Sequence, residues 1–268
     1  MPVDDRQNDP GHFRNPPTVP WVAPQGAFPN RAPAPRRMAA GRRRRSIWSV
    51  AIFVILISTI AIRAYRDLSR PEAWDYWKES WLSPSMTSSL IAKADFDGTG
   101  HSRAVLAISG TIGAASASWL RERLEEAHLG DGDAVLLSSP GGNLEQALIM
   151  GEIIRARSLA TAVGVADASG RITRSFCASA CVLVYAGGKP RYGIEGSALG
   201  VHRFVATLPG RDPVADAQRT TGMVLSYMTR MGISSSVVEA MSETSDVRWL
   251  GSKEASAMNL ITDPVGRP

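Results

Sequence analysis

The 268-residue chain has a formal net charge of +5, but this charge lies at its N-terminal end. Residues 1–45 contain nine arginines and three acidic residues, so residues 46–268 sum to about −1. A nucleic-acid-binding domain gathers lysine and arginine on its folded surface, and the near-neutral remainder argues against that class. Nine of the 17 prolines also fall within residues 1–45, with few large apolar residues, which predicts a disordered tail.

An uncharged apolar segment follows this tail. No charged residue occurs from Ser46 to Ile62, and as a helix this segment would be about 26 Å long, close to the ~30 Å hydrocarbon core of a bilayer. We expect one transmembrane helix over residues 46–65, with Trp48 and Tyr65 at the two interfaces. A signal peptide and a buried soluble helix are the alternatives, but the leader is long and no clean Ala-x-Ala cleavage site follows.

Four consecutive arginines, Arg42 to Arg45, precede the apolar segment. The arginine-rich flank of a membrane helix stays in the cytoplasm, which predicts a single-pass inner-membrane protein with a cytoplasmic N-terminus and a periplasmic C-terminal domain. Residues 66–100 are rich in tryptophan and proline near their start and are expected to form a membrane-proximal connector. Its three tryptophans either rest on lipid headgroups or pack on the domain.

Strand and helix patterns alternate within residues 101–268. Short apolar runs predict strands over 104–110, 133–142, 159–166 and 198–204. Amphipathic or apolar stretches predict helices over 116–128, 143–157, 179–188, 215–232 and 234–243. Asn143 is the expected N-cap of the second helix. This order indicates one α/β domain with largely parallel strands joined by helical crossovers.

The second predicted strand ends in the sequence SSPGG, residues 138–142. Pro140 stiffens this turn, and Gly141 and Gly142 let the backbone approach a ligand with no Cβ in the way. Amides exposed there can donate to a developing negative charge. The same sequence is also typical of a plain strand-to-helix turn, so the motif alone is weak.

Ser179 and His202 are the candidate reactive side chains. Ser179 lies where an apolar helix is expected to begin, between two alanines that leave space for a substrate carbonyl. A serine at this position is also typical of a simple helix cap. A serine hydroxyl needs a nearby base to become a nucleophile, and His202 is the histidine available for that role. A lone histidine on a strand is also often structural.

Together these three features resemble the Clp-protease/crotonase superfamily, specifically its ClpP-like serine peptidase branch. The matching motifs are the Ser-Pro-Gly-Gly turn, the Ala-Ser helix start about 40 residues later, and the histidine 23 residues after the serine. Residues 249–263 also look like the family's final helix. The resemblance extends from about Ala104 to Pro264. It implies a ClpP/crotonase-like fold, a superhelix of β-β-α units with a parallel sheet and flanking helices.

The resemblance implies a role for each site residue. Ser179 would be the nucleophile and His202 the general base. The amides of Gly142 and Ala180 would form the oxyanion hole, with Gly141 as a further candidate donor.

The third triad member is less direct. The family's Asp falls at Val247 in this chain, so Asp246, one residue earlier, is the candidate and Asp263 is the fallback. Asn259 also occupies a position where the family usually has glycine. The departures at Asp246 and Asn259 favour the alternative of a non-catalytic protein with the same fold.

The chain has only two cysteines, Cys177 and Cys181, on either side of Ser179. Residues four apart on a helix are about 6 Å apart along the axis, and exported domains can keep disulfides, so a bridge that holds the turn is one interpretation. Two buried thiols are the other. Without a matching histidine pair they do not predict a zinc site, and we expect neither metal nor cofactor. The insert 165–176 is interpreted as a flap with Arg171 and Arg174 facing an acidic substrate, or as a solvated loop.

The leading hypothesis is a membrane-anchored periplasmic serine hydrolase that acts through an acyl-enzyme. The resemblance implies a peptidase with a Ser-His-Asp triad and a protein or peptide substrate. The alternative is a partner-binding or scaffold module on the same fold, without turnover. An acyl-CoA enzyme of the crotonase type is disfavoured because CoA is cytoplasmic, whereas the domain is expected outside. The resemblance also implies a homo-oligomer. The membrane contact is expected through residues 46–65, and no nucleic-acid partner is expected.

Overall fold

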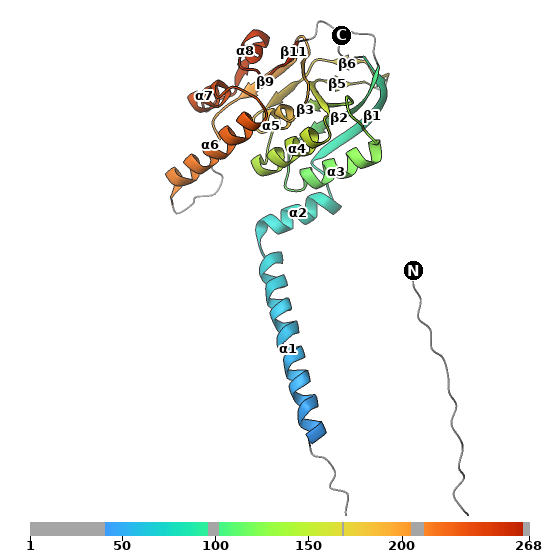
Figure 1. The fold of residues 1–268 in the computed structure, drawn as a ribbon, viewed down its shortest axis with the longest axis vertical. Coiled ribbons are helices and arrows are strands. Elements are labelled where there is room, and N and C mark those ends of the chain that lie inside the picture. The colour runs from blue at the N-terminus through green and yellow to red at the C-terminus, as the bar shows by residue number, and fades with distance from the viewer. Residues whose placement is uncertain (1–40, 96–101, 168, 205–211, 265–268) are drawn as a thin grey trace, which may run out of the picture. The chain divides into compact units, whose positions relative to one another are not determined.

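The computed structural model describes residues 41–95, 102–167, 169–204 and 212–264 (Figure 1). The tail expected over residues 1–45 therefore lies almost wholly outside the described residues. The chain divides into two compact units, residues 1–56 and residues 57–268.

Helix α1, Gly41–Leu68, contains the apolar segment. Its residues 47–68 have a mean hydropathy of 2.2, and all of their side chains are exposed. A soluble domain would bury such a surface, since about 25 cal/mol is gained for each Å² of apolar surface removed from water. Among the described residues, one helix is thus long and apolar enough to cross a membrane, as predicted.

Two elements lie within the stretch expected to be a connector, residues 66–100. Helix α2, Pro71–Trp81, begins with a proline, whose fixed φ suits the first helical position. Strand β1, Met86–Ala94, pairs antiparallel with β2, Arg103–Gly110, and so belongs to the domain's sheet. The folded domain thus includes residues before 101.

The main sheet has six strands in the order β1-β2-β3-β4-β8-β11. All neighbours except β1 and β2 run parallel, which confirms the predicted α/β class with a mainly parallel sheet. The bounds of its remaining strands are β3 Ala134–Ser138, β4 Ala160–Val163, β8 Arg191–Gly193 and β11 Asp263–Pro264. The central strands are apolar without a polar face because both faces of the sheet are covered.

The two faces of the sheet bury separate cores. Leu106, Ile108, Val135 and Leu137 point into a large core that also contains the buried sides of the helices. The alternate residues of the same strands face a smaller core that includes Ile172. That residue lies in a hairpin of two short antiparallel strands, β5 Val165–Ala166 and β6 Ile172–Thr173.

Three helices contribute to the large core, together with the buried sides of the C-terminal helices. Helices α3, Ser116–Ala127, and α4, Leu144–Ala156, connect successive parallel strands. The Asn143 side chain accepts a hydrogen bond from the Gln146 amide at 3.0 Å, so the predicted N-cap is confirmed. Helix α5, Cys181–Ala186, is buried at all six residues, which accounts for its unbroken apolar sequence.

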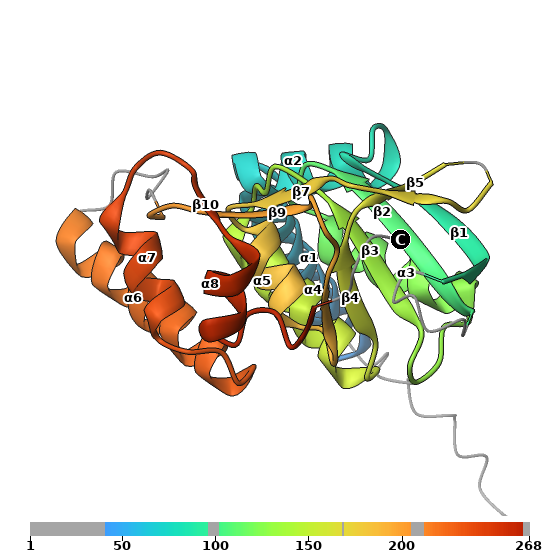
Figure 2. The same ribbon diagram turned by 90° about the horizontal axis from the view of Figure 1, so that it is seen from above.

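A second sheet leads to the C-terminal helices. Its order is β10-β9-β7, and it begins where β3 ends, because Ser139 forms a parallel bridge with Cys177. Figure 2 shows α6, α7 and α8 grouped beyond this sheet, on the side away from β1. The bounds are β7 Phe176–Ala178, β9 Ala198–Val201, α6 Pro213–Arg230, α7 Ser236–Glu243, β10 Arg248–Leu250 and α8 Ser252–Ala257.

A buried arginine fixes the C-terminal segment. The Arg191 guanidinium donates to four backbone carbonyls, including those of Asn259 at 2.7 Å and Leu260 at 2.8 Å. Burial lowers the pKa of this guanidinium below its usual value. Asn259 has a φ of +54°, a left-handed conformation that asparagine tolerates better than most residues. Asparagine at this position is therefore consistent with the local backbone.

Candidate active site

The Pro-Gly-Gly turn and the strand before Ser179 are hydrogen-bonded neighbours. The Ser139 amide donates to the Phe176 carbonyl at 3.1 Å, and the Ala178 amide donates to the Ser139 carbonyl at 3.0 Å. The ends of β3 and β7 are thereby held side by side, although about 40 residues separate them in sequence. The turn that follows β3 consequently lies next to the turn that follows β7.

Gly141 packs directly against Ser179. A Cβ added to Gly141 would lie 2.6 Å from the Ala178 carbonyl oxygen, 2.8 Å from the Ser179 Cβ and 2.9 Å from the Ala180 nitrogen. Its φ is +97°, a conformation that favours glycine. This glycine is needed for close approach and not only for a turn.

The segment 111–113 supports the other side of the glycine turn. The Ile112 amide donates to the Gly141 carbonyl at 2.8 Å, and the Asn143 amide donates to the Ile112 carbonyl at 2.7 Å. A Cβ on Gly142 would lie 2.2 Å from that Ile112 oxygen. The backbone of the turn is therefore fixed between Ile112 and Ser179.

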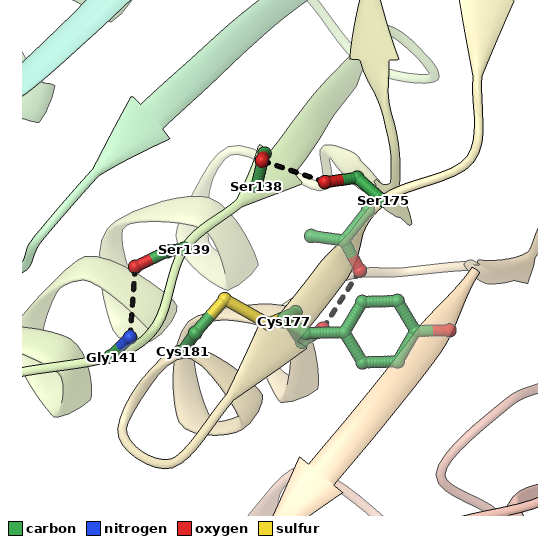
Figure 3. The surroundings of a disulfide bond; sticks show 8 residues. Ser138, Ser139, Gly141, Ser175, Cys177 and Cys181 are labelled. Atoms are coloured by element: carbon green, nitrogen blue, oxygen red, sulfur yellow. Dashed lines mark hydrogen bonds between the residues drawn. A yellow bond between two sulfur atoms is a disulfide. The ribbon is translucent and has the colours of Figure 1, made fainter. Parts of the chain in front are cut away.

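Two amides beside Ser179 have no internal acceptor. The Gly141 amide donates to the Ser139 hydroxyl at 3.0 Å, as Figure 3 shows. Within the part of the chain that the structure describes, the amides of Gly142 and Ala180 donate to no protein atom. Unpaired donors near a nucleophile are what an oxyanion hole requires. Of the three amides considered from the sequence, Gly141 is thus the one already occupied.

Ser179 occupies a strained turn between strand and helix. Its φ is +58°, a left-handed conformation that costs about 1–2 kcal/mol for a residue other than glycine. Its amide donates to the Gly200 carbonyl at 2.8 Å, and its carbonyl accepts from the Val182 amide at 3.0 Å. Its side chain is half-buried, and its hydroxyl has no hydrogen-bond partner among the described residues. Serine on a sharp strand-to-helix turn is a common way to expose a nucleophile.

The two cysteines form a disulfide bond around this turn (Figure 3). Cys177 lies in β7 and Cys181 is the first residue of α5, with their Cα atoms 5.3 Å apart. Both cysteines are fully buried. The bridge thus joins the strand end and the helix start that flank Ser179, because Cys177 precedes the helix.

His202 lies past the same end of the second sheet as Ser179. Strands β7 and β9 are parallel, with Ala178 opposite Gly200, so the chain leaves both strands at neighbouring positions. The His202 Nδ1 lies 2.7 Å from the Arg203 carbonyl oxygen. Since a carbonyl can only accept, Nδ1 must be the protonated nitrogen, and a neutral ring then has its free electron pair at Nε2. No hydrogen bond joins His202 to Ser179 in the described residues.

In the part of the chain that the structure describes, neither Asp246 nor Asp263 forms a hydrogen bond or ion pair with His202. The β9–β10 pairing ends where Val201 is opposite Arg248, so His202 directly follows the last paired residue of β9 and Val247 directly precedes the first paired residue of β10. The Asp246 carboxylate has no hydrogen bond within the described ranges, although the nearby Thr244 carbonyl accepts from the Arg203 amide at 2.9 Å. Asp263 lies in β11 of the other sheet and accepts from the Thr262 hydroxyl at 2.7 Å.

An exposed apolar patch on the second sheet was missed by sequence reasoning. It consists of Phe176 in β7, Trp249 in β10 and Val247 just before β10, all exposed. The Phe176 and Trp249 rings meet edge to face, with centroids 6.1 Å apart. Glycine at position 200 makes room for this patch, since a Cβ there would lie 2.6 Å from Val247 and 2.7 Å from Trp249. The residues belong to three separated segments, so no local pattern could reveal them.

The insert 165–176 forms the β5–β6 hairpin, in which an arginine and an aspartate pair with each other. Arg171 pairs with Asp167 at 3.1 Å, so this arginine has a partner within the hairpin. The pKa of Asp167 is lowered to about 2, mainly by a hydrogen bond from the Ser169 hydroxyl and also by the Arg171 amide. Arg174 packs beside Gly196. Across the described residues, no group of three or more His, Cys, Asp or Glu side chains gathers into a metal site.

Two of the solved structures that are similar to this chain are forms of one protein. ClpP1 from Listeria monocytogenes is 16% identical, with a TM-score of 0.48, covering 61% of this chain and 92% of its own. A point mutant of the same protein is also 16% identical, with a TM-score of 0.47, covering 61% of this chain and 91% of its own. No family model and no curated relative matches the chain.

Proposed function

We propose that this chain is a membrane-anchored serine hydrolase that cleaves peptide bonds. Ser179 is the nucleophile, His202 is the general base, and the amides of Gly142 and Ala180 form the oxyanion hole. The observation that carries the proposal is the left-handed Ser179 turn, packed against Gly141, with two unpaired amides next to it. A chain that needed only a turn here could avoid both the strained serine and the unpaired donors.

The proposed reaction has two halves. The Ser179 Oγ gives its proton to His202 Nε2 and attacks the substrate carbonyl carbon, while the new oxyanion accepts from the two amides. The imidazolium then protonates the departing amine, which leaves an acyl-enzyme. Water, deprotonated by His202, attacks this ester and releases the acid and the serine hydroxyl.

The orientation of His202 is part of the proposal. Its Nδ1 donates to the Arg203 carbonyl, which selects the tautomer with a basic Nε2 without a carboxylate. Asp246 remains the carboxylate proposed for the triad because of its place in the chain, one residue before Val247. In this arrangement the Arg203 carbonyl orients the ring, and Asp246 stabilises the imidazolium if its loop approaches during turnover.

The test is labelling of the full chain in detergent with a fluorophosphonate probe. Ser179 is expected to become covalently labelled, and Ser179→Ala should abolish labelling. Ser175→Ala is the matched control, because its hydroxyl lies four residues earlier and is already bonded to Ser138 at 2.7 Å. A folded chain that never labels would exclude the hydrolase.

A partner-binding module is the second candidate, and one observation favours it. Val247 and His202 directly adjoin the last paired position of β9 and β10, and no carboxylate in the described ranges forms a hydrogen bond or ion pair with the imidazole. The apolar patch of Phe176, Val247 and Trp249 could then serve recognition without turnover. This module predicts saturable binding of a partner that is unaffected by Ser179→Ala.

We also propose that α1 anchors the domain on the periplasmic side of the inner membrane. The arginine-rich sequence before the apolar segment supports this orientation. An alkaline phosphatase fused to the C-terminus should be active, and an inactive fusion would reverse the orientation. Assembly into a homo-oligomer, which only the family resemblance implies, predicts a multiple of 28.7 kDa in sedimentation equilibrium.

A further inference from the structure

Helix α2 presents a row of tryptophans to solvent. Trp74, Trp77 and Trp81 are spaced i, i+3 and i+7, which puts them on one face of the helix. Their exposed fractions are 63%, 47% and 76%, and the following Leu82 is 74% exposed. Large apolar side chains gathered in this way on a folded surface mark an interaction site.

The opposite face of α2 is tied to the domain. Glu79 lies two residues from both Trp77 and Trp81, so its side chain leaves the helix on the other side. Its carboxylate accepts from the Ser85 hydroxyl at 2.5 Å, from the Ala115 amide at 3.1 Å and from the Ser116 hydroxyl at 3.1 Å. Ala115 and Ser116 begin α3, where a carboxylate is favoured by the unpaired amides of a helix start (Figure 1).

Gly113 makes room for this carboxylate. A Cβ at Gly113 would lie 2.1 Å from Glu79 Oε2 and 2.3 Å from Glu79 Oε1. The attachment of α2 therefore depends on three hydrogen bonds to the Glu79 carboxylate and on the absence of a side chain at Gly113. With α2 fixed in this way, the tryptophan face cannot turn inward to bury itself against the domain.

The connection to α1 identifies what covers the tryptophans. Only Ser69 and Arg70 separate the end of α1, Leu68, from the start of α2. Tryptophan is the residue most typical of the boundary between headgroups and acyl chains, where its ring is apolar and its N–H remains hydrated. The interspersed charges of α2, such as Asp75 and Lys78, exclude a second membrane crossing and suit a helix that lies in the interface.

A cavity of about 280 Å³ lies between α2 and the start of α3. Trp77, Trp81 and Trp119 line it, but so do Glu79 and Ser116, which form the attachment of α2. The cavity therefore belongs to the contact between α2 and the domain, and the exposed fractions of the tryptophans carry the argument for a lipid-facing surface.

We propose that α2 is an interfacial helix. Its tryptophan face inserts at the boundary between lipid headgroups and acyl chains, while Glu79 on the other face holds the domain, so that the bilayer surface fixes the domain's orientation. The inference rests on the proposed membrane anchoring by α1, but not on catalysis. The occupant is lipid, and binding is expected to need no anionic headgroup.

The first experiment measures tryptophan quenching by brominated lipid. The full chain is placed in phosphatidylcholine nanodiscs whose acyl chains are brominated close to the headgroup. The variant W74S/W77S/W81S should lose most of the quenching that the native chain shows beyond the contribution of Trp48, which the variant Trp48→Phe measures. Trp249→Ser is the matched control, because Trp249 is 51% exposed but lies in β10, and it should leave the quenching unchanged.

Two outcomes would overturn the proposal. In one, the triple variant and the native chain are quenched equally, so lipid does not reach α2. In the other, the tryptophans are shielded from lipid by a second copy of the chain, seen as a dimer that the triple variant loses. Resistance to alkaline carbonate extraction reports separately on α1, and fluorophosphonate labelling reports separately on Ser179.

A second experiment tests the Glu79 attachment. Gly113→Ala should push the carboxylate away and speed amide hydrogen exchange at Ala115 and along α2, with lipid quenching retained. Gly130→Ala is the control, because a Cβ there would meet nothing within 4 Å. Unchanged exchange in Gly113→Ala would mean that Glu79 does not hold α2.

Discussion

The two halves of the candidate site differ in how completely they are built. Around Ser179, the glycine turn, the paired ends of β3 and β7, and the disulfide all fix the backbone. Around His202, one carbonyl orients the ring and no carboxylate forms a hydrogen bond or ion pair with it among the described residues. The difference shows that positioning a nucleophile and activating it are separate structural tasks. In this chain, more contacts position Ser179 than orient His202.

Removing the glycine turn should have the largest effect. Gly141→Ala places a methyl group against Ala178, Ser179 and Ala180 at a left-handed position, and we expect labelling of Ser179 to fall by about 10²-fold or more. Gly132→Ala is the control, because Gly132 also has a positive φ but no atom within 4 Å of the added Cβ. It should cost only about 1–2 kcal/mol of backbone strain, measured by thermal unfolding. Equal labelling of both variants would show that the turn does not shape the site.

Adding a carboxylate near His202 should have the second-largest effect on labelling. Val247→Asp introduces a carboxylate next to the end of the β9–β10 pairing that His202 also adjoins, and we expect labelling to accelerate by about 10-fold, a part of the ~10⁴-fold effect of the aspartate in a serine triad. Val247→Asn, which has the same shape without the charge, should give no acceleration. If both variants label at the native rate, His202 is not limited by a missing carboxylate.

Removing the disulfide should have a smaller effect, which is a loss of stability around Ser179. The double variant C177A/C181A removes a short covalent loop, and we expect a loss of about 2 kcal/mol in the free energy of unfolding. Urea denaturation followed by near-ultraviolet circular dichroism measures this loss, with reduced native chain as the matched comparison. A drop in labelling beyond the fraction unfolded would show that the bridge also positions Ser179.

The smallest effect is expected away from both halves, in the β5–β6 hairpin. The pKa of Asp167 is lowered to about 2, so the hairpin tip is stabilised above the usual carboxyl pKa of about 3.9 and loses this stabilisation as the pH falls toward 2. Carbon-13 NMR should follow this titration. Ser169→Ala removes the main cause and should raise the Asp167 pKa, while Arg174→Ala should not. Between pH 5 and 8 the hairpin should not respond to pH.

The predictable parts of the fold are those that local patterns encode. The buried strands β2, β3 and β4 and the helices α3 and α4 follow from apolar periodicity and an asparagine cap. Strand β1 gives no such signal, because it is an edge strand with mostly exposed side chains. Strands β8 and β10, of three residues each, are too short for a period to show.

The same distinction applies to the site. The glycine turn and Ser179 each belong to a contiguous motif, so their spacing alone suggested a resemblance. The end of the β9–β10 pairing, which His202 adjoins, depends on the register between these strands, about 50 residues apart, and the group that orients the ring is a backbone carbonyl, which any residue could supply. Neither can be read from residue identity.

The Cys177–Cys181 bond relates the structure of the Ser179 turn to the compartment in which the domain folds. Glutathione and thioredoxin keep thiols reduced in the cytosol, whereas disulfides form and persist after export. With the topology that we propose, a newly made chain would reach the membrane without the Cys177–Cys181 bond and would be cross-linked only on the oxidising side. Under the proposed topology, translocation would thus be the step that cross-links the turn around Ser179.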